Sequence, residues 1–99
     1  MYRIGLSSCG FELTEENFAE LSRSNISAIE ISMAAEKYSS IDYKEVSELS
    51  KRYNVELWSY HLPFFPFSEI DISSLDSRLR ENAIRLYSEL MQKATDIGI

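Results

Sequence analysis

The chain has 99 residues, of which 44% are apolar and 26% are charged, and its formal net charge is −6. This size and balance predict one globular domain with one core. The acidic charge argues against a nucleic-acid surface, because Lys and Arg carry most phosphate contacts. The sequence shows neither an apolar stretch long enough to span a bilayer nor the pattern of a signal peptide. We therefore expect a cytoplasmic protein with no membrane or nucleic-acid partner.

Cys9 is the only cysteine, which excludes a disulfide within one chain and a zinc site built from several thiolates. No pattern of partner residues typical of a nucleophilic cysteine surrounds it. We interpret Cys9 as a structural residue at the end of a strand. The surrounding segment 8–10 has neither the dinucleotide fingerprint nor the Walker spacing, so a phosphate-binding loop is not expected there.

The first predicted unit is a strand over residues 2–7 followed by a helix. Thr14 is the expected N-cap, because two glutamates follow it at the positive end of the helix dipole. Leu13 and Phe18 have the spacing of a hydrophobic staple. Phe18 and Leu21 should form the buried side of this helix, which is expected to end near residues 24–25.

The second predicted unit is a strand over residues 27–32, a loop, and a helix. Asp42 and Glu45 have the spacing of a capping box, with an acidic cap. Val46 and Leu49 continue at helical spacing and should face the core.

The third predicted unit is a strand over residues 55–62 and a long helix. Pro63 and Pro66 should end the strand, because proline cannot donate to a sheet ladder. The helix is expected from residue 75 or 76 to residue 97, with Gly98 after its end. Its apolar stripe is expected to comprise Leu79, Ala83, Leu86, Leu90, Ala94 and Ile97, widened by Tyr87 and Met91.

Alternating strands and helices of this length predict an α/β fold with parallel strands joined by right-handed crossovers. Side chains alternate across each strand, so the predicted strands have two different faces. The first face is large and apolar and should lie against helices; it carries Ile4, Leu6, Ile29, Ile31, Trp58 and Tyr60. The second face is small or polar; it carries Gly5, Ser7, Ala28, Glu30, Ser32, Ser59 and His61.

A doubly wound sheet has helices on both faces, and its strands read as continuous apolar runs. In this chain only one face is suited to helices. A barrel explains the other face, because inward residues near the carboxyl ends of barrel strands build active sites. The sequence therefore predicts a partial (β/α) TIM barrel of about three parallel βα units, with residues 1–99 as a single domain.

Glu30 and His61 are expected to project into one shared space near the carboxyl ends of the strands, beside Ser7 and Ser59. Glu30 could instead be an exposed residue paired with a lysine, and His61 could be a hydrogen-bonded structural histidine. The aromatic loop, residues 64–67, could be a substrate wall, an interface patch or a packed lid. Glu30 and His61 make up at most half of a metal site or of an acid–base pair.

The segment from Trp58 to Phe64, with His61-Leu62-Pro63-Phe64 at its end, and the following Asp71-Ile72-Ser73-Ser74 resemble the xylose isomerase-like TIM barrel superfamily. That superfamily includes sugar phosphate isomerases and epimerases and the endonuclease IV group. The segments 4–7 and 28–31 are similar to its first and second strands.

The resemblance implies a divalent-metal site at the barrel mouth, with Mn, Zn, Mg or Co, and a small sugar or sugar-phosphate substrate. On this basis Glu30 is a catalytic candidate, His61 is a metal-ligand candidate, and Ser7, Ser59 and Phe64 are substrate-binding candidates. The first function hypothesis is the N-terminal portion of a metal-dependent sugar or sugar-phosphate isomerase or epimerase. The alternatives are a fragment of an endonuclease IV-like phosphodiesterase and a small binding module without enzymatic activity.

A complete barrel of this kind takes roughly 250 residues, so we expect the chain to be the truncated N-terminal part of a longer enzyme. We expect it to be inactive alone and to hold no stably bound metal. Three strands taken from a barrel would leave two unpaired edges, so a homo-oligomer is expected. The interface should use the outer strands or the last helix, with Phe18, Leu86, Tyr87, Leu90 and Met91 partly exposed.

Overall fold

The computed structural model describes residues 2–99, which form a mixed α/β fold with a three-stranded parallel sheet. In chain order the elements are β1 (Gly5–Ser7), the 3₁₀ helix η1 (Ser8–Gly10), α1 (Glu15–Arg23), β2 (Ala28–Ile31), the 3₁₀ helix η2 (Ala35–Ser40), α2 (Tyr43–Tyr53), β3 (Glu56–Tyr60) and α3 (Ser77–Asp96). The sheet order is β1-β2-β3, and both pairings are parallel. The predicted succession of three βα units is confirmed.

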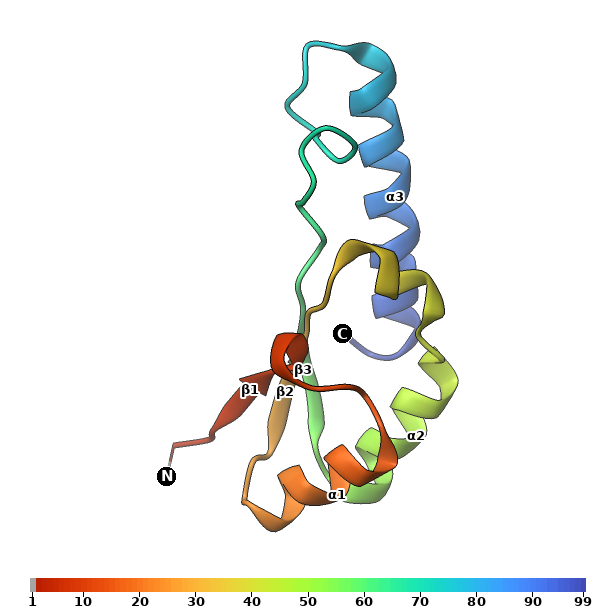
Figure 1. Ribbon diagram of the computed structural model, residues 1–99. Coiled ribbons are helices and arrows are strands. Elements are labelled where there is room, and N and C mark those ends of the chain that lie inside the picture. The colour runs from red at the N-terminus through yellow and green to blue at the C-terminus, as the bar shows by residue number, and fades with distance from the viewer. Residues whose placement is uncertain (1) are drawn as a thin grey trace.

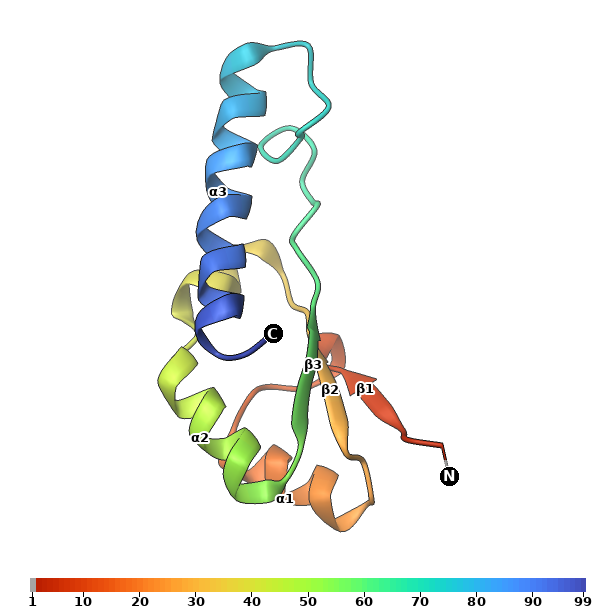
Figure 2. The same ribbon diagram turned by 180° about the vertical axis from the view of Figure 1, so that it is seen from behind.

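The helices lie on one side of the sheet, and the other face is uncovered (Figures 1 and 2). Helices α1 and α2 pack against β2 and β3, where Phe18 and Leu21 meet Val46 and Leu49 above Ile29. Helix α3 runs beside the segment 61–76 and projects beyond the sheet, which gives the molecule an extent of 47 × 23 × 23 Å. None of the helices in residues 2–99 has the length and apolarity to cross a membrane.

Side-chain caps fix where the helices begin, as the sequence predicts. Thr14 Oγ1 accepts a hydrogen bond from the Asn17 amide at 3.3 Å, and the Asp42 carboxylate accepts one from the Glu45 amide at 3.0 Å. Each cap satisfies a backbone donor that has no partner inside the helix. Helix α3 is followed by Gly98, whose φ of 89° suits a residue without a side chain.

A β-bulge in β3 corrects the predicted faces of that strand. Ile29 pairs with Leu57 and Glu30 pairs with Ser59, so Trp58 is an extra residue with no partner on β2. A bulge places two consecutive side chains against one position of the neighbouring strand and shifts the alternation. Leu57 therefore faces the helices, and Trp58, 64% exposed, lies on the uncovered face. The prediction that Trp58 packs against helices is wrong.

Burial corrects three further expectations. Ile4 and Leu6 are 59% and 45% exposed, because within residues 2–99 no helix lies beyond the outer edge of β1. Phe18 is fully buried instead of partly exposed; it belongs to the core cluster against which Phe11 and Leu13 pack.

Leu90 is also buried. Helix α3 lies along the segment 61–76, in which Pro63 and Ile70 are buried too (Figure 1). Met91 is exposed and Leu86 and Tyr87 are half-buried, as expected for the flank of α3. The first strand begins at Gly5 and not at residue 2.

Candidate functional site

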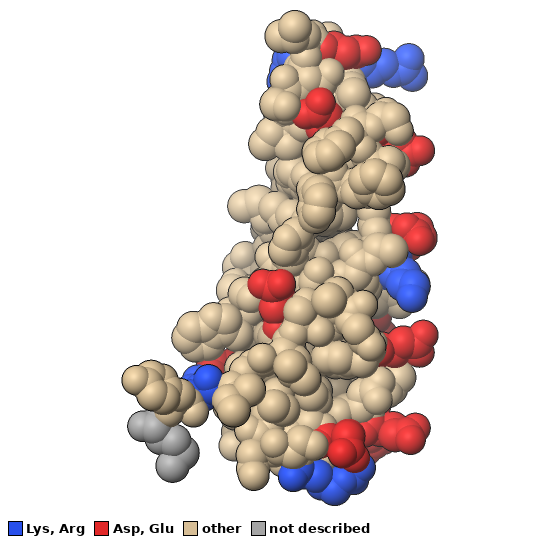
Figure 3. Space-filling view, turned by 60° about the vertical axis from the view of Figure 1, so that its left-hand side comes forward, with Lys and Arg blue, Asp and Glu red and all other residues tan. Residues whose placement is uncertain are grey.

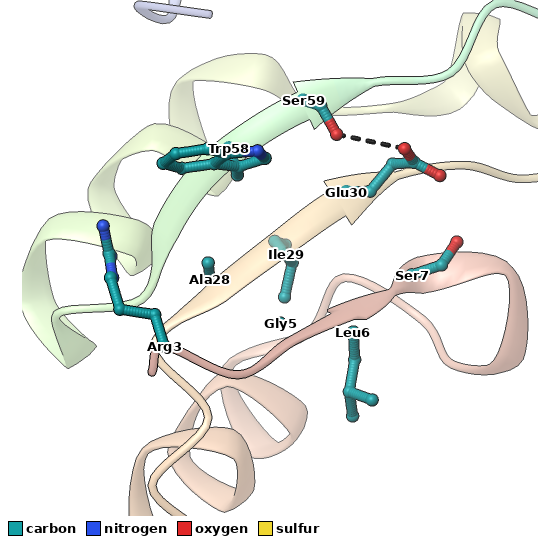
Figure 4. A pocket seen from close by; sticks show the side chains of 9 residues that line it. All are labelled: Arg3, Gly5, Leu6, Ser7, Ala28, Ile29, Glu30, Trp58 and Ser59. Carbon is teal, nitrogen blue, oxygen red and sulfur yellow. Dashed lines mark hydrogen bonds between the residues drawn. The ribbon is translucent and has the colours of Figure 1, made fainter. Parts of the chain in front are cut away.

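The uncovered face of the sheet contains a hollow of about 480 Å³. Residues from all three strands line it, together with Arg3, which precedes β1 (Figure 4). Ser7, Glu30 and Ser59 stand at its carboxyl end, and Trp58 and Arg3 stand at its amino end. Three of the five predicted site residues are therefore brought together: Ser7, Glu30 and Ser59.

Sheet register aligns these three polar residues. Ser7 pairs with Glu30, and Glu30 pairs with Ser59, so the three residues form one row across the strands. Ser59 Oγ donates a hydrogen bond of 3.0 Å to Glu30 Oε2 (Figure 4). This bond holds the Glu30 carboxylate beside Ser59 at the carboxyl end of the hollow. With Leu57 on the helix side, strict alternation would place Ser59 on the helix side too, and the bulge brings it instead opposite Glu30.

Arg3 and Trp58 form the other end of the hollow, and sequence reasoning missed both. The Arg3 guanidinium lies 5.7 Å from the centre of the Trp58 ring, a distance typical of a cation–π contact. Arg3 also forms an ion pair with Glu56 at 2.6 Å and donates to the Ser27 carbonyl at 3.3 Å. Arg3 thereby ties the chain before β1 to the starts of β2 and β3.

His61 and Phe64 lie in a second hollow, of about 320 Å³, formed with residues 32–36 and 63–66. The prediction that Glu30 and His61 share one space is therefore not met in this structure. His61 is exposed, and its ring lies 5.6 Å from that of Phe64. His61 Nδ1 lies 2.9 Å from the Leu62 carbonyl oxygen, so the tautomer that satisfies this contact carries its proton on Nδ1. The Nε2 lone pair then remains free for a metal or a proton.

Two buried hydroxyls hold the loops around these hollows, and neither was singled out from the sequence. Ser8 Oγ donates to the Ser32 carbonyl and accepts from the Ser32 amide, both at 2.8 Å, which joins the ends of β1 and β2. The Tyr38 hydroxyl donates to the His61 carbonyl oxygen and so connects η2 to the end of β3. The two consecutive serines at the end of β1, Ser7 and Ser8, are the sequence signal that could have identified Ser8 as a residue that hydrogen-bonds to the neighbouring strand end.

Tyrosines anchor β3 from the helix side. The Tyr60 and Tyr43 hydroxyls share a hydrogen bond of 2.6 Å, and the Tyr60 ring packs edge-on against Tyr38 with centroids 5.5 Å apart. Burial raises the pKa of Tyr60 above its ordinary value of 10.0, and the hydrogen bond with Tyr43 raises it further. These contacts hold the backbone of β3 in place at Tyr60, and thereby the adjacent residues Ser59 and His61.

The donors present in the described chain do not complete a metal site. Glu30 Oε1 and His61 Nε2 are chemically suited to divalent cations, but they line different hollows. Within residues 2–99 no group of three or more His, Cys, Asp or Glu side chains comes together in a way that could hold an ion.

Comparison with protein-family models, with curated proteins and with solved structures found no match for this chain.

Proposed function

We propose that this chain supplies three βα units of the barrel of a metal-dependent sugar or sugar-phosphate isomerase or epimerase. The observation that carries the proposal is the row of Ser7, Glu30 and Ser59 at the carboxyl ends of three parallel strands, on the face without helices. Ligands of parallel α/β folds bind at the carboxyl ends of strands. The row is backed by the resemblance of the segment 58–64 to the xylose isomerase-like superfamily.

The residues of the row have complementary roles in this proposal. The Glu30 carboxylate takes the proton from the hydroxyl-bearing carbon next to a substrate carbonyl and returns it to the former carbonyl carbon, while the proton of that hydroxyl moves to the carbonyl oxygen. Epimerisation would need a second proton donor on the opposite face of the substrate. The hydroxyls of Ser7 and Ser59 bind sugar hydroxyls, and the Ser59 bond keeps the carboxylate in place. A divalent metal, when bound by the complete site, would polarise the carbonyl–hydroxyl pair. His61 would contribute one imidazole to that site, and we expect the isolated chain to be inactive.

A second candidate function is a binding module that uses the aromatic loop, residues 64–67. Phe64, Phe65 and Phe67 are all more than half exposed, and exposed apolar clusters mark interaction sites. The endonuclease-like alternative has no comparable support, since the net charge of −6 disfavours contacts with a phosphate backbone.

An NMR titration of the ¹⁵N-labelled chain tests the proposal at the level of single residues. Zn²⁺, the sugar fructose 6-phosphate, and a DNA duplex with an abasic-site analogue are added separately. The proposal predicts saturable, weak shifts of the amides of Ser7, Glu30 and Ser59 with the sugar phosphate, and of His61 with Zn²⁺. Because the isolated chain offers only part of the site, sugar affinities in the millimolar range are expected, about −4 kcal/mol of binding free energy.

Matched variants make the titration specific. Glu30→Gln should abolish the sugar-induced shifts, whereas Glu48→Gln, which changes an exposed carboxylate on α2, should leave them intact. Sugar phosphate that shifts no amide of the row would contradict the proposal. Shifts confined to residues 64–67 would favour the binding module, and saturable binding of the DNA would favour the endonuclease-like alternative.

A further inference from the structure

Tyr38 is the one buried side chain of the segment 32–42, which joins β2 to α2. It lies on the 3₁₀ helix η2 and is 2% exposed, although connecting segments usually run over the surface of a protein. Its hydroxyl accepts a hydrogen bond from the Met33 amide at 3.4 Å and donates one to the His61 carbonyl oxygen. Met33 follows β2 and His61 follows β3, so this hydroxyl joins the carboxyl ends of two neighbouring strands.

The surroundings of this hydroxyl keep it in the form that donates. Burial raises the pKa of Tyr38, because the phenolate is poorly solvated there. The phenol has one proton, and the Met33 amide can only donate, so that proton goes to the His61 carbonyl oxygen. The Tyr60 ring packs edge-on against the Tyr38 ring, with centroids 5.5 Å apart, and helps to hold the phenol in place.

The peptide groups on both sides of His61 are held by hydrogen bonds. The His61 amide donates to the Ile31 carbonyl oxygen at 2.8 Å, and the His61 carbonyl accepts the Tyr38 proton. Beyond this point, and within the part of the chain that the structure describes, no backbone–backbone hydrogen bond involves residues 62–65. The bond from Tyr38 is therefore the last one that ties the chain to the rest of the fold before the aromatic loop.

The orientation of the His61–Leu62 peptide in turn sets the contact of the imidazole. A peptide group is planar, so a bond to the His61 carbonyl also restricts the amide of Leu62. His61 Nδ1 lies 2.9 Å from the Leu62 carbonyl oxygen, one peptide group further along. A carbonyl oxygen can only accept, so this contact requires the proton on Nδ1 and leaves a free lone pair on Nε2. A rotation of the His61–Leu62 peptide would move the Leu62 carbonyl away from Nδ1.

Within residues 2–99 no acidic side chain bonds to the imidazole. Glu36 lines the same hollow as His61, but neither a hydrogen bond nor an ion pair joins the two side chains. In the view of Figure 3 the Asp and Glu side chains lie mainly along one margin of the molecule. The Leu62 carbonyl is therefore the group of the described chain that selects the tautomer of His61.

We propose that Tyr38 is a positioning residue for His61. By holding the His61–Leu62 peptide, its hydroxyl keeps the imidazole proton on Nδ1 and leaves Nε2 free as an acceptor in the second hollow. The proposal rests on the proposed function for the use that the complete site makes of His61. The effect on the tautomer is a property of the chain without metal or sugar.

NMR of the imidazole tests the proposal directly, because His61 is the only histidine. Long-range ¹H–¹⁵N correlation spectra of the ¹⁵N-labelled chain, recorded without ligand at a pH where the imidazole is neutral, distinguish Nδ1–H from Nε2–H. The wild type should carry the proton mainly on Nδ1. Tyr38→Phe keeps the ring and removes the donor. It should lower the ratio of Nδ1–H to Nε2–H by about two- to tenfold, the equilibrium effect of one net hydrogen bond.

Tyr53→Phe is the matched control. It removes a hydroxyl that donates to Glu15 Oε1 at 2.8 Å at the end of α2, and it should leave the ratio unchanged. Circular dichroism should show that both variants are folded. A second measurement needs no variant: the Tyr38 hydroxyl proton of the wild type should exchange slowly enough to give a resonance, with a nuclear Overhauser contact to the Met33 amide.

Four results would overturn the proposal. They are a wild-type proton mainly on Nε2, a Tyr38 hydroxyl that exchanges freely with water, a Tyr38→Phe ratio equal to that of the wild type, and a Tyr53→Phe variant that lowers the ratio as strongly. None of these measurements involves metal or sugar, so their outcome is separate from that of the sugar-phosphate titration.

Discussion

Replacing Tyr60 by Phe removes one hydroxyl from the pair that joins β3 to α2. The Tyr60 and Tyr43 hydroxyls lie 2.6 Å apart, and both side chains are half-buried. Tyr60→Phe keeps the ring and its packing against Tyr38 but leaves the Tyr43 hydroxyl without this partner. A neutral hydrogen bond contributes about 0.5–1.5 kcal/mol, so we expect Tyr60→Phe to destabilise the fold by about 1 kcal/mol.

A double-mutant cycle separates the bond from the packing. Tyr43→Phe alone should also cost about 1 kcal/mol, because it leaves the Tyr60 hydroxyl unpaired. The double variant should cost about 1 kcal/mol and not 2, since no unpaired hydroxyl remains, which gives a coupling energy of about 1 kcal/mol. Urea denaturation measures all four free energies of unfolding. In thermal unfolding each single variant should lose about 4–8 °C. Additive losses, or a Tyr60→Phe variant as stable as the wild type, would refute the hydrogen bond as a link between β3 and α2.

Four further predictions concern the core, an ion pair, pH and metal content. Ile29→Ala empties a fully buried position on the central strand and should cost about 2–5 kcal/mol in urea denaturation. Arg3→Ala breaks the half-exposed pair with Glu56 and should cost under about 1 kcal/mol, a loss that shrinks further at high salt. The pKa of Tyr60 is raised above 10.0 in the folded chain, so its contribution to stability is complete below pH 10 and is lost as the pH rises above 10. The difference in free energy of unfolding between wild type and Tyr60→Phe should therefore narrow above pH 10. Elemental analysis of the purified chain should find no stoichiometric metal, because His61 alone binds weakly; one tightly held ion per chain would contradict this.

Local sequence signals predicted the helices well. Thr14 and Asp42 cap their helices as expected, because a capping residue acts within three residues and needs no tertiary information. The apolar positions Phe18 and Val46 face the core for the same reason, since helical periodicity is a local property.

The faces of β3 could not be predicted from alternation, because the bulge depends on pairing with β2. No glycine or proline occurs between residues 55 and 62 to mark it, so strict alternation placed Trp58 with the apolar set. The bulge pairs Ser59 with Glu30. The predicted proximity of Ser59 and Glu30 is therefore present, but it results from the bulge and not from the strict alternation on which the prediction was based. The position of Arg3 over Trp58 was missed because it joins two segments 55 residues apart in the chain.

The separation of His61 from Glu30 also depends on tertiary structure. β3 ends at Tyr60, and the chain continues into the aromatic loop. There the His61 ring lies next to the Phe64 ring and to the carbonyl oxygen of the following residue, Leu62. The sequence predicts which strand end carries His61, but the direction of its side chain depends on the path of the following loop.

The central claim is that Ser7, Glu30 and Ser59 share the uncovered face because β3 is bulged at Trp58. Nuclear Overhauser effects in the ¹³C,¹⁵N-labelled chain test it most directly. The account predicts contacts of the Trp58 ring with Arg3, contacts of Leu57 with the α1 and α2 side chains, and a Glu30–Ser59 side-chain contact. A Trp58 ring in contact with Leu21 or Val46, or a Ser59 side chain distant from Glu30, would contradict it.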